Sequence, residues 1–146
     1  MRVKTCTFFG NRDAPESVKP LLQTVLQDLI EEQHVKKFYV GNEGRFDAMT
    51  QRLLKEFAHS HGIDYSVVLA YMPKKTDPFF ESYYTLLPEG IEAVPLRFAI
   101  EYRNNWMIEH CDIVLTYVTS LHGGAAKFKA FAEKKGKTVI EISDFR

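Results

Sequence analysis

DIVLTYVTSLHGGAAK, at residues 112–127, predicts a strand, a loop and a helix in succession. The apolar run at 113–115, continued by Tyr117 and Val118, is typical of a strand buried on both faces of a parallel sheet. Gly123 and Gly124 then open a segment whose apolar residues recur at helical spacing, while its lysines take the other side. Those apolar residues are Ala125, Phe128, Phe131 and Ala132.

The glycine pair also predicts a place for an anion. Glycines at a strand-to-helix turn let backbone N–H groups approach a phosphate closely, and the helix dipole adds partial positive charge there. A Gly-Gly pair is equally common as plain loop punctuation, and two glycines do not make a dinucleotide fingerprint. A phosphate seat and an ordinary turn therefore both remain open at Gly123 and Gly124.

Upstream of this stretch the chain repeats the same alternation of strand and helix. The short β-rich runs each precede an amphipathic segment, which indicates right-handed crossovers and a parallel sheet. Five strands with intervening helices predict a doubly wound α/β fold. The expected strands are 5–9, 37–40, 65–70, 113–118 and 138–142, and the expected helices are 18–32, 49–61, 96–110 and 124–135.

Polar or glycine-bearing residues follow four of the expected strands. The ligand site of a doubly wound fold lies beyond the C-terminal ends of its strands, so these residues are candidates for binding. A purely structural domain does not need polar residues or glycines at the C-terminal end of each of these strands. The candidates at the strand ends, with Arg103 from the expected helix, are Gly10, Asn11, Arg12, Gly41, Asn42, Glu43, Gly44, Asp47, Tyr71, Arg103, Thr119, Gly123 and Gly124.

The region 74–95 breaks the alternation and carries no clean period. It is rich in aromatic residues, among them Phe79, Phe80, Tyr83 and Tyr84. A segment of this kind in a compact domain acts as a lid over a ligand, as a surface for a partner, or as cover for one edge of the sheet. All three alternatives stay open.

Composition narrows the class of protein. The 146 residues fit one domain, and 19 basic against 19 acidic side chains give a formal net charge of zero, without the global basic footprint of a nucleic-acid binder. No histidine or cysteine spacing predicts a metal site, and no cofactor is expected. Nothing at the N-terminus resembles a signal peptide or a membrane span, so we expect a cytoplasmic protein without a membrane partner.

Five short motifs, in this order and at this spacing, resemble the SLOG superfamily and, within it, small proteins of the YpsA-like branch. They are FFGNRD at 8–13, YVGNEGRFD at 39–47, AYMP at 70–73, RNNWM at 103–107 and HGGAA at 122–126. The resemblance spans nearly the whole chain. It implies a Rossmann-like three-layer αβα sandwich with strand order 3-2-1-4-5, and a site for nucleotides or their derivatives between the first and fourth strands.

The superfamily also contains the lonely guy enzymes, which cleave the N-glycosidic bond of nucleoside monophosphates. Arg103 and Met107 match their arginine helix, and Gly123 and Gly124 match the start of their glycine loop. Ala130, however, stands where those hydrolases carry a glutamate. An oxocarbenium-like transition state needs a nearby negative charge, so such an activity requires a substitute carboxylate from Glu43 or Asp47.

We therefore expect a protein that binds or senses a nucleotide or nucleotide-derived small molecule. The alternative is a phosphoribohydrolase with Arg103 and Glu43 as catalytic residues, and a third option is DprA-like binding of single-stranded DNA, which the zero net charge disfavours. Because assemblies are common in the superfamily, and aromatic residues gather at 79–84, a homodimer or larger homo-oligomer is expected.

Overall fold

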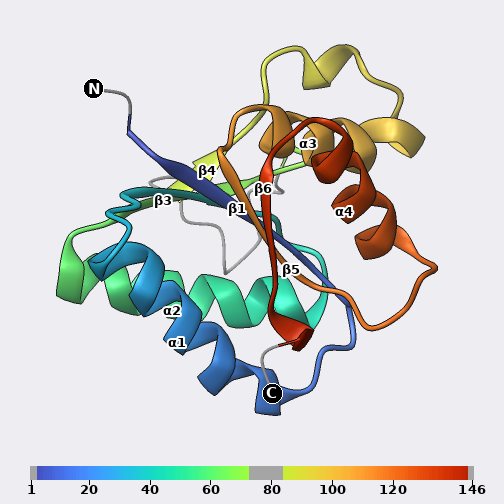
Figure 1. Cartoon of the computed structure of the whole chain (residues 1–146). Helices are drawn as coiled ribbons and strands as arrows, with labels where there is room; N and C mark the ends of the chain where they lie inside the picture. Colours follow the sequence, from blue (N-terminus) through green and yellow to red (C-terminus); the bar gives the residue numbers. More distant parts are fainter. Residues whose placement is uncertain (1–2, 73–83, 145–146) are drawn as a thin grey trace.

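The computed structural model of the chain describes residues 3–72 and 84–144. Within them six strands form one sheet in the order β4-β3-β2-β1-β5-β6, and every neighbouring pair is parallel. The central strand β1 pairs with β2 on one side and β5 on the other (Figure 1). The strands are β1 Thr5–Gly10, β2 Lys37–Val40, β3 Asp64–Val68, β4 Thr85–Leu86, β5 Ile113–Tyr117 and β6 Thr138–Glu141.

The five expected strands and their order 3-2-1-4-5 are confirmed, with one addition. Strand β4 extends the sheet beyond β3, although it contains only Thr85 and Leu86. A two-residue strand between prolines has no periodicity to read, which is why the sequence did not reveal it. Tyr84, just before it, stacks on Tyr65 of β3 at 4.8 Å between ring centroids, so this part of the region 74–95 covers the sheet edge.

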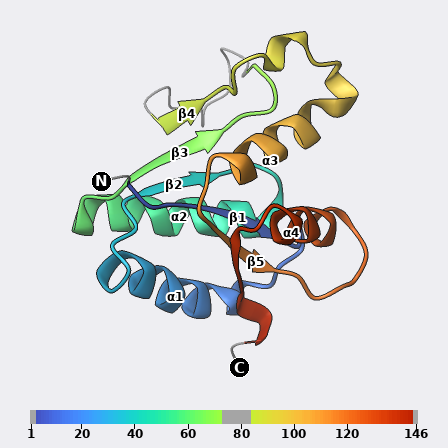
Figure 2. The same cartoon turned by 45° about the horizontal axis from the view of Figure 1, so that its top comes forward.

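Two helices cover each face of the sheet, which confirms the three-layer α/β fold. Helices α1 (Lys19–Glu31) and α2 (Gly44–His61) lie on one face, and α3 (Ala99–Glu109) and α4 (Gly124–Lys134) lie on the other (Figures 1 and 2). The expected helix 96–110 is in fact a short 3-10 turn, Leu96–Phe98, followed by α3. None of the described helices is long and apolar enough to cross a membrane.

Strand β1 divides the core because successive side chains point to opposite faces of a sheet. Phe8 packs in the cluster formed with α1 and α2, and stacks on Phe38 at 6.0 Å. Phe9 packs in the cluster formed with α3 and α4, and stacks on Phe128 at 5.5 Å. Truncating such a buried ring to alanine costs about 3–5 kcal/mol, so β1 anchors both layers.

The strand order reverses at β1, and this places the loops that matter. The chain runs outward from β1 through β2, β3 and β4, then returns to the other side of β1 as β5. The loops after β1 and β5 therefore part in opposite directions and leave a crevice between them, where doubly wound proteins bind ligands. The free cysteines, Cys6 and Cys111, are buried away from that crevice, and burial raises the pKa of the Cys111 thiol to about 12.

Candidate functional site

A cavity of about 140 Å³ lies at this switch point, beyond the C-terminal end of β1. Its walls come from β1, from the loops after β1 and β2, from the first turn of α2, and from α3 and α4. Charged groups and apolar walls therefore meet in one hollow. The lining residues are Phe8, Phe9, Gly10, Arg12, Glu43, Asp47, Ile100, Arg103, Asn104, Met107, Gly124, Ala125 and Phe128.

Arg103 is the most deeply placed charged group of the cavity, with only 1% of its surface exposed. Its Nη1 donates to Asn42 Oδ1 at 3.1 Å and to Val68 O at 2.9 Å, and its Nε donates to Asn104 Oδ1 at 2.6 Å. Burial lowers the pKa of Arg103 from its ordinary value, while the nearby charges of Asp47 and Glu43 oppose that shift. The guanidinium is thus fixed in position by neutral acceptors.

Asp47 is the carboxylate that accompanies Arg103 in the cavity. Burial raises the pKa of Asp47 to about 6, against the opposing effects of a hydrogen bond from the backbone N–H of Glu43 and the charge of Arg103. That hydrogen bond, at 2.9 Å to Oδ2, is the one that Asp47 accepts within the described residues. Perturbed carboxylates in a cleft mark functional sites more often than chance, so Asp47 is the foremost acid–base candidate.

Gly41 explains how the two charged groups come together. A side chain at Gly41 would place its Cβ 2.8 Å from Asp47 Oδ2, closer than real Cβ atoms come, and 3.2 Å from Arg103 Nη1, which is a tight contact. The glycine therefore lets α3 and the start of α2 bring a cation and an anion to the same spot above β2. Gly41 itself does not line the cavity.

A second, more exposed ion pair spans the loops after β1 and β2. Arg12 Nη2 lies 3.2 Å from Glu43 Oε2, and the two side chains are 75% and 28% exposed. The loops are held together by the hydrogen bond from Arg45 N to Arg12 O at 2.8 Å. Gly44 permits this approach because its φ is +91° and a Cβ there would lie 2.7 Å from Arg12 Cα.

The N-terminus of α4 forms the opposite rim. Gly123 precedes the helix at φ 106° and ψ 176°, a conformation open in practice only to glycine, and no side chain caps the helix. Gly124, the first helical residue, lines the cavity, and a Cβ at either glycine would meet nothing within 4 Å. The first N–H groups of a helix have no partner within it, so this rim suits an anion.

Several predicted residues lie beside the cavity rather than in it. Asn11 donates to Thr119 Oγ1 and joins the loops after β1 and β5, while Tyr71 is 42% exposed and donates to Leu96 O at 3.3 Å. Asn42 holds Arg103 from behind. Of the thirteen predicted positions, the cavity brings together Gly10, Arg12, Glu43, Asp47, Arg103 and Gly124. The aromatic residues Phe79, Phe80 and Tyr83 lie outside the described residues.

Sequence reasoning overlooked the apolar wall of the cavity. Ile100, Asn104 and Met107 share one face of α3 with Arg103, at the three- and four-residue spacings that place helical side chains together. Their helical spacing from Arg103 was the signal in the sequence that could have identified them as neighbours of the site. Phe128 was expected on the apolar side of the helix 124–135, and in the structure it both stacks on Phe9 and lines the cavity.

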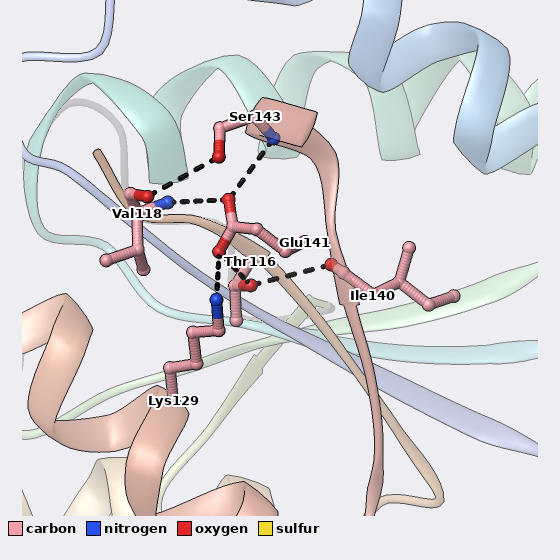
Figure 3. A network of polar contacts seen from close by, with 6 residues as sticks. All are labelled: Thr116, Val118, Lys129, Ile140, Glu141 and Ser143. Carbon is pink, nitrogen blue, oxygen red and sulfur yellow. Dashed lines mark hydrogen bonds and ion pairs between the residues drawn. The ribbon is translucent and has the colours of Figure 1, made fainter. Parts of the chain in front are cut away.

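A second carboxylate, Glu141, lies at the end of β6 and was also overlooked. Its Oε1 accepts hydrogen bonds from Thr116 Oγ1 at 2.7 Å and from Lys129 Nζ at 3.0 Å (Figure 3). Its Oε2 accepts from two backbone N–H groups, of Val118 at 2.9 Å and Ser143 at 3.2 Å. The network ties the end of β5 to α4 and to the C-terminal turn, and so supports the rim of the cavity from outside.

Comparison with solved structures places this geometry on a known scaffold. The DNA processing protein A (DprA) of Streptococcus pneumoniae aligns with 94% of this chain at a TM-score of 0.72 and 18% sequence identity. This chain shares its fold with DprA. It covers 49% of the DprA chain, so it spans about half the length of that protein. No protein-family model and no curated protein sequence matches the chain.

Proposed function

We propose that the protein binds a nucleotide or nucleotide-derived small molecule in the cavity at the switch point. The observation that carries this proposal is the meeting of buried Arg103, the carboxylate of Asp47 and the uncapped N-terminus of α4 in one hollow. Such a cavity offers one ligand a cation, a hydrogen-bond acceptor and an anion-binding helix N-terminus. The likeness to DprA, whose superfamily is SLOG, supports the site's location, and we assign the chain to the YpsA-like branch on its motifs.

The dimensions favour a ligand that is only partly enclosed. Cavities that surround a drug-sized ligand measure about 300–1,000 Å³, whereas this one measures about 140 Å³. One moiety of a nucleotide fits inside, and the remainder lies on the rim formed by α4 and the loop of Arg12. Binding of this kind serves sensing or carriage without requiring a reaction.

Thermal unfolding in the presence of nucleotides tests the proposal. A ligand at one hundred times its dissociation constant stabilises by about 2.7 kcal/mol, which is readily measured. The panel comprises nucleoside monophosphates, cyclic dinucleotides and ADP-ribose derivatives. Gly124→Val places a branched side chain at the anion rim and should abolish the stabilisation, whereas Ala126→Val, one residue outside the lining, should preserve it. Equal ligand shifts in wild type and a folded Gly124→Val protein would contradict the proposal.

One observation favours an enzyme as the second candidate. Asp47 lines the cavity with a pKa of about 6 and lies beside Arg103, so it supplies the carboxylate that position 130 lacks. Ala130 itself is exposed and outside the lining. Chromatography of free base released from nucleoside monophosphates separates the two readings. Repeated turnover by wild type that disappears in Asp47→Asn would make the protein a phosphoribohydrolase, with Glu43→Gln testing the other carboxylate.

DNA binding is the third candidate, and its support is the fold shared with DprA. The charges weigh against it. Three of the lysines on and just after α4 are paired with acidic residues: Lys127 with Glu101, Lys129 with Glu141 and Lys135 with Glu109. Self-neutralised lysines give little counterion release, so we expect weak, salt-sensitive binding of single-stranded DNA at most. A homodimer or larger assembly remains a prediction, for which light scattering is the measurement.

A further inference from the structure

The guanidinium of Arg103 is not arranged as a phosphate clamp. Arginine grips a phosphate best through two parallel N–H groups, taken from Nη1 and Nη2 or from Nε and Nη2. In this protein Nε and Nη1 are both committed to neutral acceptors, on Asn104, Asn42 and Val68. Within residues 3–72 and 84–144, Nη2 makes no hydrogen bond, so a single nitrogen is left for a ligand.

Asp47 presents a matching acceptor. Its Oδ2 accepts the N–H of Glu43, and its Oδ1 makes no hydrogen bond among the described residues. Every fully buried side-chain nitrogen or oxygen in that part of the chain has a partner, so these two unmatched atoms are accessible. Both residues line the cavity, and both crowd the position of a Gly41 Cβ. The wall of the cavity therefore carries a donor on Arg103 and an acceptor on Asp47 that the described residues leave unfilled, beside the amide of Asn104.

The charges inside the cavity balance rather than add. Asp47 offsets Arg103 in the interior, as Glu43 offsets Arg12 at the mouth. A phosphate driven into the interior would meet a carboxylate in a poorly solvated place, where like charges repel strongly. Apart from Asn104, whose side-chain oxygen accepts a hydrogen bond from Arg103, the rest of the interior wall is largely apolar, from Phe9, Ile100, Met107 and Phe128. Such a wall suits the face of a ring.

We infer that the interior takes the uncharged nucleoside end of the ligand, hydrogen-bonded between Arg103 and Asp47, and that the phosphate remains on the rim. This inference rests on the proposed function and gives it an orientation. The rim then has its own role, because the N-terminus of α4, with its partial positive charge, and the exposed cation of Arg12 both line the cavity. Specificity comes from the interior, and added affinity for charged ligands comes from the rim.

A ligand series on the whole chain tests the orientation. The probes are adenosine, guanosine, cytidine and uridine, their 5′-monophosphates, and inorganic phosphate, each titrated by calorimetry. At least one nucleoside should bind without a phosphate, its monophosphate should bind about tenfold more tightly, and inorganic phosphate alone should not bind. Binding of inorganic phosphate with no nucleoside bound would overturn the orientation and leave the proposed function standing. Absence of binding by the whole series would overturn the proposed function, and the orientation with it.

The sign of one substitution gives a second, independent readout. Asp47→Asn should weaken the nucleoside about fivefold, because a charged acceptor becomes a neutral one, and should leave inorganic phosphate unbound. If phosphate instead occupies the interior, removing the carboxylate charge tightens phosphate and monophosphate binding, and the inference fails. Asp13→Asn makes the same change of charge on the exposed loop after β1, outside the cavity lining, and should alter neither affinity.

Discussion

Two carboxylates lie at the same edge of the sheet, and their surroundings differ in one decisive respect. Glu141 accepts four hydrogen bonds, one of them from the ammonium of Lys129 (Figure 3). Asp47 accepts one among the described residues. Burial acts to raise the pKa of both, but the four donors hold the pKa of Glu141 below its usual value, while the pKa of Asp47 rises to about 6.

The number of donors therefore separates a carboxylate that the fold fills from one that keeps unfilled lone pairs, as the proposed ligand site requires. A buried charge is tolerated when its lone pairs are filled, and it then fixes the elements that fill them. A buried carboxylate that lacks some of its hydrogen-bond donors lowers the stability of the folded protein. Such destabilising groups are retained at functional sites, where a ligand supplies the missing donors. Glu141 of β6 is hydrogen-bonded to residues of β5 and α4, whereas Asp47 lines the cavity together with Arg103.

The first prediction concerns Glu141, where the largest effect is expected. Glu141→Gln removes the charge and turns one oxygen acceptor into a donor facing the N–H groups of Val118 and Ser143. We expect the free energy of unfolding to fall by about 2–3 kcal/mol, as for the loss of charged hydrogen bonds in a nearly buried place. Urea unfolding followed by circular dichroism measures it.

Glu109→Gln is the matched control for this change. Glu109 also pairs with a lysine, Lys135, but both side chains are about half exposed and the atoms are 4.0 Å apart. An exposed pair contributes about 0–1 kcal/mol, so the control should change stability little. Equal effects from the two substitutions would show that the four donors around Glu141 do not distinguish it.

Asp47→Asn should act in the opposite direction. Because the pKa of Asp47 is raised to about 6 in the folded protein, from 3.8 in the unfolded chain, ionising it above pH 6 lowers the free energy of unfolding. Asparagine removes that cost, and we expect a gain of about 1–2 kcal/mol at pH 8, after allowing for solvent screening and for the lost charge at the start of α2.

The pH dependence makes this prediction specific. Wild type and Asp47→Asn should differ fully above pH 6 and converge as the pH falls below about 4, where Asp47 of the wild type becomes protonated in both the folded and the unfolded state. Thermal unfolding across that range, with Asp13→Asn as an exposed control, measures the convergence. A variant that is less stable than wild type at pH 8 would show that Asp47 is a supporting carboxylate like Glu141.

The sequence predicted the scaffold well because the scaffold rests on local patterns. The buried strand before Gly123 and Gly124, and the alternation of strands with amphipathic helices, identified the parallel sheet, while the resemblance to the SLOG superfamily supplied its strand order. Glycines after β1 and β2 pointed to the C-terminal ends of the strands, and the cavity lies there. Gly41 and Gly44 proved to matter through close approach of other elements, which a sequence cannot display.

The contrast between the two carboxylates was beyond the reach of the sequence. The donors to Glu141 come from residues 116, 118, 129 and 143, which only the fold brings together. Asp47 was named as a binding candidate and as a substitute carboxylate, but the raised pKa that sets it apart comes from burial, which only the fold produces. Likewise Arg103 was chosen by resemblance, and its committed Nε and Nη1 became visible only with its neighbours in place.

The smallest effect is expected at Glu43, a carboxylate between the two extremes. It is 28% exposed and pairs with Arg12, itself 75% exposed, so Glu43→Gln should change stability by less than about 0.5 kcal/mol.

The effect of Glu43→Gln on ligand binding is more informative. If Arg12 serves the phosphate at the rim, Glu43 competes with that phosphate, and its neutralisation should tighten monophosphate binding about two- to fivefold without changing nucleoside binding. Glu16→Gln, which releases Arg52 from a similarly exposed pair outside the cavity lining, is the control in calorimetry. Weaker binding of both ligands in Glu43→Gln would instead mean that Glu43 contacts the nucleoside itself, and the boundary between interior and rim would then have to be drawn on the other side of this residue.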